Sequence, residues 1–121
     1  MSYFIKALVI DDNSDARVSV SKALARLGCN VNEALTSDEG ITELSLNPYN
    51  VVFASLCVKK IGARGIARWV RDNCPATKVF LVTSWKGHLD NQILSVEGIH
   101  GIIHKPLLFN EIRDTLLEHL G

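Results

Sequence analysis

The sequence predicts an α/β fold, a doubly wound, five-stranded parallel sheet with five helices. Short apolar runs alternate five times with segments of helical periodicity along the 121 residues, and the connections between them are short. Several of these runs are rich in β-branched residues and lack polar alternation, which is typical of strands buried on both faces. A chain of this size can bury a core without disulfides, so we expect residues 1–121 to form a single domain.

The predicted strands are short and end at polar or glycine-containing turns. They are residues 7–10, 29–34, 51–54, 78–82 and 101–104. The second strand alternates apolar with polar residues, which indicates an edge of the sheet.

Helical periodicity marks the segments that follow these strands. Apolar residues recur at helical spacing from Ala16 to Leu27, and Gly28 ends this first helix. A Thr-x-x-Glu capping box at Thr36 opens the second helix, and residues 58–65 are predicted to be a loop before the third. The expected apolar faces of the last three helices are Ile66, Trp69 and Val70; Leu89, Ile93 and Val96; and Leu108, Ile112, Leu116 and Leu120.

Composition disfavours several classes of partner and compartment. The 13 basic and 13 acidic residues cancel, so the sequence does not favour a nucleic acid or a membrane surface as partner. Cys29, Cys57 and Cys74 lack disulfide or zinc spacing, which favours reduced thiols in the cytoplasm. The sequence has no evident signal peptide and no apolar run of membrane-spanning length, so we expect a cytoplasmic protein.

Polar residues that could bind a ligand or take part in a reaction follow the predicted strands at their carboxyl ends. They are Asp11, Asp12, Ser55, Thr83 and Lys105. In a parallel sheet the carboxyl ends of all strands lie on the same side, so these side chains should converge on one crevice. Two adjacent carboxylates need a positive partner, either a metal ion or a lysine, and Lys105 is the candidate. The alternative is that the two aspartates only form a turn and cap the next helix.

Three motifs carry a resemblance to a known family. They are residues 8–13 (Leu-Val-Ile-Asp-Asp-Asn), the hydroxyl of Thr83 within residues 82–84, and the pair Lys105-Pro106. At this spacing, and across the whole chain, the sequence resembles the response-regulator receiver domains of two-component signalling, which are CheY-like.

The resemblance implies a flavodoxin/CheY-like strand order of 2-1-3-4-5. It also implies that the first acids bind magnesium and that an aspartate ending the third strand accepts phosphate from a partner histidine. Thr83 and Lys105 match the hydroxyl and the lysine that hold the phosphoryl oxygens in the family.

The sequence departs from the family pattern at the positions that matter most. Ser55 stands at the phosphoacceptor position, Ile102 at the aromatic switch position, and Val58-Lys59 where a Met-Pro pair is usual. A serine would form a persistent ester and would need a general base. These departures predict a degenerate receiver, in which Thr83 remains but the acceptor and the switch aromatic are lost.

Metal binding should also be weakened. The predicted magnesium ligands are Asp11, Asp12 and, by resemblance, the backbone carbonyl of Cys57. Magnesium prefers sites of high negative charge, so the loss of a carboxylate at position 55 predicts weak binding and no required cofactor. Lys105 could then pair directly with Asp11 or Asp12.

The expected function is a pseudo-receiver that acts as a phosphorylation-independent interaction module and is not an enzyme. By resemblance, a histidine kinase or an output protein would bind the last two helices and the last strand, and the last two helices could form a homodimer. Trp85, in a loop beside Lys86, is a candidate partner contact.

Three alternatives remain open. The chain could be a phosphate- or small-anion-binding receiver that still switches through Asp11, Asp12, Thr83 and Lys105. One of the two aspartates could itself accept phosphate in place of Ser55. The crevice could instead bind a phosphorylated small molecule or catalyse phosphoryl chemistry, although the sequence has no glycine-rich phosphate loop.

The histidines and the basic residues are predicted to be ordinary. His88, His100, His104 and His119 share no metal-ligand spacing on one element. A basic group is expected to form a solvated face, with an anionic partner as the alternative; its members are Lys59, Lys60, Arg64, Arg68 and Arg71.

Overall fold

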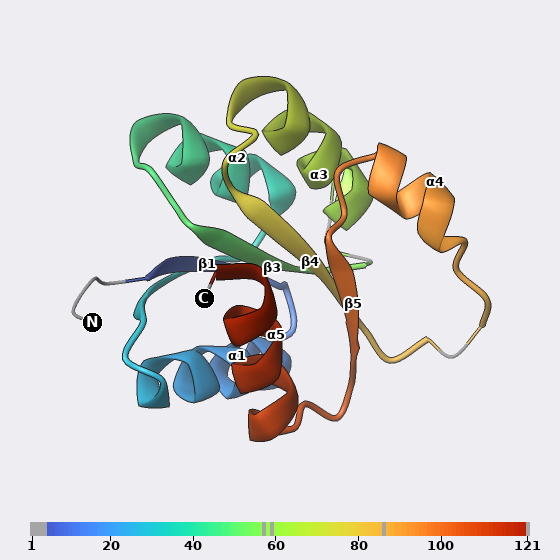
Figure 1. Ribbon diagram of the computed structural model, residues 1–121. Coiled ribbons are helices and arrows are strands. Elements are labelled where there is room, and N and C mark those ends of the chain that lie inside the picture. Colours follow the sequence, from blue (N-terminus) through green and yellow to red (C-terminus); the bar gives the residue numbers. More distant parts are fainter. Residues whose placement is uncertain (1–4, 57, 59, 86, 121) are drawn as a thin grey trace.

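The computed structural model describes residues 5–56, 58, 60–85 and 87–120, and Figure 1 shows its ribbon. A single parallel sheet has the strand order β2-β1-β3-β4-β5, which confirms the predicted fold class and topology. The strands are β1 (Lys6–Ile10), β2 (Asn30–Ala34), β3 (Val51–Ser55), β4 (Lys78–Thr83) and β5 (Gly101–His104). The helices are α1 (Ser14–Arg26), α2 (Ser37–Leu46), α3 (Gly62–Asn73), α4 (Asn91–Val96) and α5 (Phe109–Leu120).

Helices cover both faces of the sheet. In Figure 1, α1 and α5 lie on one face, and α2, α3 and α4 lie on the other. Successive strand residues point to opposite faces. Phe53 of β3 therefore packs toward α1 and α5, whereas Val52 and Ala54 pack toward α2 and α3. Every residue of β3 is buried, while β2 is largely exposed at the sheet edge, as its alternating sequence predicts.

The predicted loop at residues 58–65 is wrong at its carboxyl end, because α3 already begins at Gly62. Ala63, Ile66, Ala67 and Val70 are all buried and follow the spacing of one helix face. Burial of this continuous apolar stripe outweighs the low helix propensity of the glycines at its start.

The predicted faces of the last two helices need correction. In α4, Leu94 is buried, whereas Ile93 is 51% and Val96 is 72% exposed. The side chain of Asp90 caps α4, so Leu89 precedes the helix and does not share its periodicity. In α5, Ile112 and Leu116 are buried as predicted, but Leu108 lies before the helix and is exposed.

Two further predictions are tested by the described residues. Cys29 and Cys74 carry free thiols, while Cys57 lies outside the described residues. Across the described ranges, no helix is both long and apolar enough to cross a bilayer.

Candidate functional site

Asp11 lies at the carboxyl end of β1, and its side chain is only 4% exposed. Its backbone N–H donates to the carbonyl of Ala34 at 3.1 Å. Its Oδ1 accepts the backbone N–H of Asn13 at 2.9 Å, and its Oδ2 accepts a hydrogen bond from Lys105 Nζ at 3.3 Å. Both carboxylate oxygens therefore already have partners. Asp12, the next residue, is exposed.

Lys105 reaches Asp11 from the far side of the crevice. It follows β5, and its backbone N–H donates to the carbonyl of Thr83 at 2.8 Å. The Lys105–Pro106 peptide bond is cis. The lysine side chain remains 24% exposed while its ammonium pairs with Asp11. The positive partner predicted for the paired acids is thus this lysine, and it binds Asp11.

Ser55 and Thr83 lie between these two residues in the sheet. Ser55 ends β3 and Thr83 ends β4, and both are buried. The Oγ1 of Thr83 accepts the backbone N–H of Trp85 at 2.9 Å. The threonine hydroxyl therefore holds the first turn of the following loop. Trp85 itself is half exposed two residues after the end of β4, and its neighbour Lys86 lies outside the described residues.

Arg17 is a residue of this site that the sequence analysis did not identify. From the first turns of α1, its Nη1 donates to the backbone carbonyl of Asp11 at 3.0 Å. Its Nε donates to Glu33 Oε1 at 2.7 Å, which links α1 to the edge strand β2. The sequence holds one indication of this role, because Arg17 follows the capping residue Asn13 by one helical turn and so lies close to the end of β1. Its partner Glu33 is distant in sequence, so the contact itself could not be predicted.

Two other positions were predicted to belong to the site. Ile102 of β5 pairs in register with Leu81 and is partly buried against the core on the α2–α3 side of the sheet. Cys57, whose backbone carbonyl was the predicted third metal ligand, lies outside the described residues.

The described residues fit a strong magnesium site poorly. Asp11 and Asp12 supply carboxylates at the crevice, but the oxygens of Asp11 accept hydrogen bonds from Lys105 and Asn13. Ser55 contributes a neutral hydroxyl. In the parts of the chain that the structure describes, no group of three or more His, Cys, Asp or Glu residues is arranged to hold a metal ion. A divalent cation at Asp11 would compete with the lysine ammonium for the same carboxylate.

His100 is a hydrogen-bonded histidine, as predicted. Its Nδ1 accepts the backbone N–H of Val79 at 3.1 Å, so the ring is neutral in this arrangement. Burial is the main cause that lowers the pKa of His100 below 6.5, and the positive charge of Lys78 and the neighbouring His119 add to this effect.

Comparisons with known proteins agree with this architecture. The family model for the response regulator receiver domain matches residues 7–117. Protein PilG of Pseudomonas aeruginosa is 20% identical over 118 residues, which cover 96% of this chain and 87% of that protein.

Solved structures give the same result. Chemotaxis response regulator CheY4 of Vibrio cholerae superposes with a TM-score of 0.88 at 21% identity, covering 98% of this chain and 100% of the other. A receiver domain protein from Clostridium thermocellum superposes with a TM-score of 0.84 at 26% identity, covering 97% and 94% of the two chains. The family match across residues 7–117 shows that the chain belongs to the response regulator receiver domain family.

Proposed function

We propose that this chain is a pseudo-receiver of two-component signalling, a phosphorylation-independent module that binds a protein partner. The observation that carries the proposal is the Lys105–Asp11 ion pair beside Ser55, a neutral hydroxyl at the end of β3. The crevice neutralises its buried acid with its own lysine. It therefore requires neither a metal ion nor a phosphoryl group to complete its charge balance.

The chemistry of Ser55 supports this proposal. A serine hydroxyl is a weak nucleophile unless a base takes its proton. Asp11, the buried carboxylate of the crevice, already accepts hydrogen bonds from Lys105 and Asn13. Its oxygens are thus engaged by donors other than Ser55. Phosphate transfer from a phosphohistidine to Ser55 should therefore be unproductive, and we propose that the domain is not an enzyme.

The switch positions support a fixed conformation. The Thr83 hydroxyl already accepts the amide of Trp85, and the side chain at position 102 is an isoleucine packed against the core. In the family, an aromatic ring at that position moves together with the threonine or serine. Here neither residue is arranged for such a change, so a partner would bias the conformation only through its own differential affinity.

The proposed docking surface comprises α4, β5 and α5. Ile93, Val96 and Leu108 are exposed on these elements or beside them, and Trp85 lies exposed in the loop before α4. A shallow cavity of about 620 Å³ lies between α4 and β5, lined in part by Leu94 and Ile102. We propose a histidine kinase or an output protein as the partner, with neither nucleic acid nor membrane involved. A homodimer through the last two helices would use the same side of the molecule.

An amide-shift titration by NMR tests the proposal. Magnesium and then beryllofluoride, an acyl-phosphate mimic, are added to the wild type and to a Ser55→Asp variant. We expect only weak, unsaturated magnesium shifts in the wild type and none with beryllofluoride. The variant restores the third carboxylate, so magnesium should bind it at least about tenfold more tightly, as charge count tunes such sites. This variant also controls for reagent quality and for the integrity of the crevice.

Saturable wild-type shifts that spread from Lys105 to β5 would overturn the proposal. They would instead favour a receiver that still switches through its acids, Thr83 and Lys105. Incubation with a small phosphodonor then identifies the acceptor. Phosphate incorporation that survives Ser55→Ala but disappears with Asp12→Asn would assign the reaction to the aspartate.

A further inference from the structure

Helix α4 cannot be stable through its own packing and hydrogen bonds. It has only six residues, from Asn91 to Val96, and isolated helices of this length do not persist in water. Among its described side chains, Leu94 is buried whereas Ile93 and Val96 face solvent. The surface that we propose for partner binding therefore includes a helix that needs support from elsewhere in the fold.

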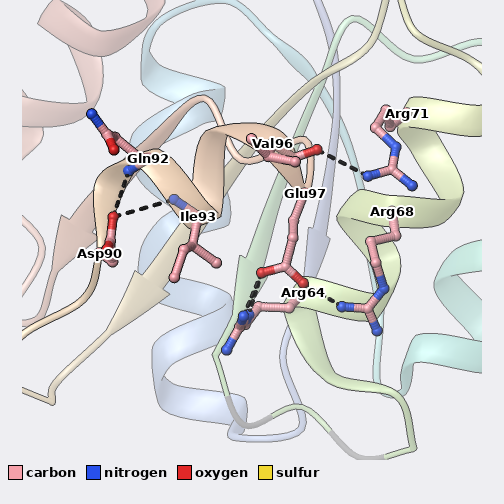
Figure 2. A network of polar contacts seen from close by, with 8 residues as sticks. All are labelled: Arg64, Arg68, Arg71, Asp90, Gln92, Ile93, Val96 and Glu97. Atoms are coloured by element: carbon pink, nitrogen blue, oxygen red, sulfur yellow. Dashed lines mark hydrogen bonds and ion pairs between the residues drawn. The ribbon is translucent and has the colours of Figure 1, made fainter.

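Three arginines of α3 support the carboxyl end of α4, as Figure 2 shows. Arg64 donates from Nε to Glu97 Oε1 at 2.8 Å, and its Nη2 contacts the same oxygen. Arg68 donates from Nη1 to Glu97 Oε2 at 2.6 Å. Arg71 donates from Nη1 to the backbone carbonyl of Val96 at 2.9 Å. We call these three arginines with Glu97 and the Val96 carbonyl the arginine clamp.

The position of Glu97 is unfavourable without these arginines. It is the residue at the carboxyl end of α4, where the helix dipole disfavours a negative side chain. Its side chain is only 14% exposed, whereas Arg64 and Arg68 are nearly half exposed. The hydrogen bond from Arg64, together with that from Arg68, lowers the pKa of Glu97. This lowered pKa favours the charged form of the carboxylate, which is the form that both guanidinium groups bind.

Backbone packing places the end of α4 against α3 at the same point. Gly98 has a φ of +98°, and a Cβ atom there would lie 2.7 Å from the carbonyl oxygen of Ala67. The chain therefore passes directly over α3, next to the row of arginines. At the opposite end of α4, Asp90 Oδ1 accepts the backbone N–H groups of Gln92 and Ile93 at 2.9 and 3.3 Å. Polar contacts thus hold both ends of a helix that has little apolar packing.

We propose that the arginine clamp is a conformational latch that fixes α4 on α3 independently of the phosphoacceptor crevice. The latch joins α3 to α4 through side chains outside the crevice, so the α4–β5 surface would keep one position without phosphate. The role of the latch in partner binding rests on the proposed function, whereas its effect on the position of α4 does not. Arg64 and Arg68 bind the Glu97 carboxylate and Arg71 binds the Val96 carbonyl. These three arginines and Lys60 are nevertheless exposed, in agreement with the predicted solvated face, while Lys59 lies outside the described residues.

Amide hydrogen exchange of the full chain tests the latch. We compare the wild type with Glu97→Gln, which keeps the size of the side chain but removes its charge. The reporters are the amides of Leu94 and Glu97, which donate to the carbonyls of Asp90 and Ile93 within the α4 turn. Loss of the charge-assisted hydrogen bonds should speed their exchange about tenfold, while amides of β3 should be unchanged.

A matched control separates the latch from a general effect of charge. Glu118→Gln removes an equal charge from an exposed position of α5. It should leave α4 exchange at the wild-type rate. The reciprocal variants Arg64→Gln and Arg68→Gln should each speed α4 exchange, and Arg113→Gln on α5 is the matched control for either.

Unchanged α4 exchange in Glu97→Gln, or an equal rise in Glu118→Gln, would overturn the latch. These results do not depend on magnesium, beryllofluoride or a partner. Failure of the latch is therefore distinguishable from failure of the proposed function, which the NMR titration reports separately.

Discussion

Replacing Lys105 with methionine tests the charge balance of the crevice. The substitution keeps an unbranched stem of similar size but removes the ammonium that pairs with Asp11 at 3.3 Å. The Asp11 carboxylate is 4% exposed, so it would remain buried without its cation. We expect Lys105→Met to lower the free energy of unfolding by about 2 kcal/mol, because an uncompensated buried charge is costly.

The magnitude follows from the geometry. At 3.3 Å and an effective dielectric constant of about 20, the Coulomb attraction is roughly 5 kcal/mol. Desolvation of both charges offsets most of this attraction. The lysine side chain is 24% exposed, so solvent screens the pair further. The coupling energy between the two residues should therefore be about 1 to 2 kcal/mol, between the values for exposed and buried pairs.

A double-mutant cycle in urea measures this coupling. It uses the wild type, Lys105→Met, Asp11→Asn and the double variant. Asparagine keeps an oxygen that can accept the Asn13 amide, so the cycle isolates the ion pair. The exposed Arg113–Asp114 pair serves as control and should show no measurable coupling. A coupling for Lys105 and Asp11 no larger than that of the control pair would refute the reasoning.

In a magnesium titration, Lys105→Met should also bind the ion more tightly than the wild type, since the competing ammonium is gone.

Three further predictions concern stability. Gly98→Ala should lower the free energy of unfolding more than Gly28→Ala does, by about 1 kcal/mol or more. Both glycines have positive φ, but a Cβ at position 98 would lie 2.7 Å from a backbone carbonyl oxygen of α3, whereas one at position 28 would have no described atom within 4 Å. Equal unfolding free energies for these variants would contradict the close approach. Ser21→Ala should stabilise the fold more than Ser45→Ala does, by up to about 1 kcal/mol. The buried Ser21 hydroxyl has no hydrogen-bond partner among the described residues, whereas that of Ser45 donates to a helix carbonyl. Urea midpoints in the reverse order would refute this. Because burial lowers the pKa of His100 in the folded state, the unfolded state binds a proton more readily. The contribution of His100 to the free energy of unfolding should therefore be complete above pH 6.5 and should decline as the pH falls from there through the folded-state pKa. His100→Gln should flatten that decline, and an unchanged pH profile in the variant would show that another group causes it.

Local sequence patterns predict much of the fold. The unbroken apolar run of residues 51–54 predicts a central strand, and β3 is the fully buried strand of the sheet. The alternating residues of β2 predict an edge, which the strand order confirms. These predictions succeed because strand periodicity reports burial on one or both faces.

The errors occur where local pattern and tertiary packing compete. The start of α3 reads as a loop because of its glycines, yet the stripe from Ala63 to Val70 is buried in the core. In α4, the spacing of Ile93 and Val96 suggests a buried face, yet both are exposed. A helix of six residues carries too little periodicity to identify its face, so its neighbours determine it.

The sequence by itself determined the fold class, the convergence of Asp11, Ser55, Thr83 and Lys105 at one sheet edge, and the absence of a carboxylate at position 55. These follow from strand periodicity and residue identity alone. The tertiary structure decided which acid pairs with Lys105, that Arg17 contacts Asp11, and that the α3 arginines bind Glu97. Such contacts join residues far apart in the chain, and their geometry depends on how the sheet and helices pack rather than on any local pattern.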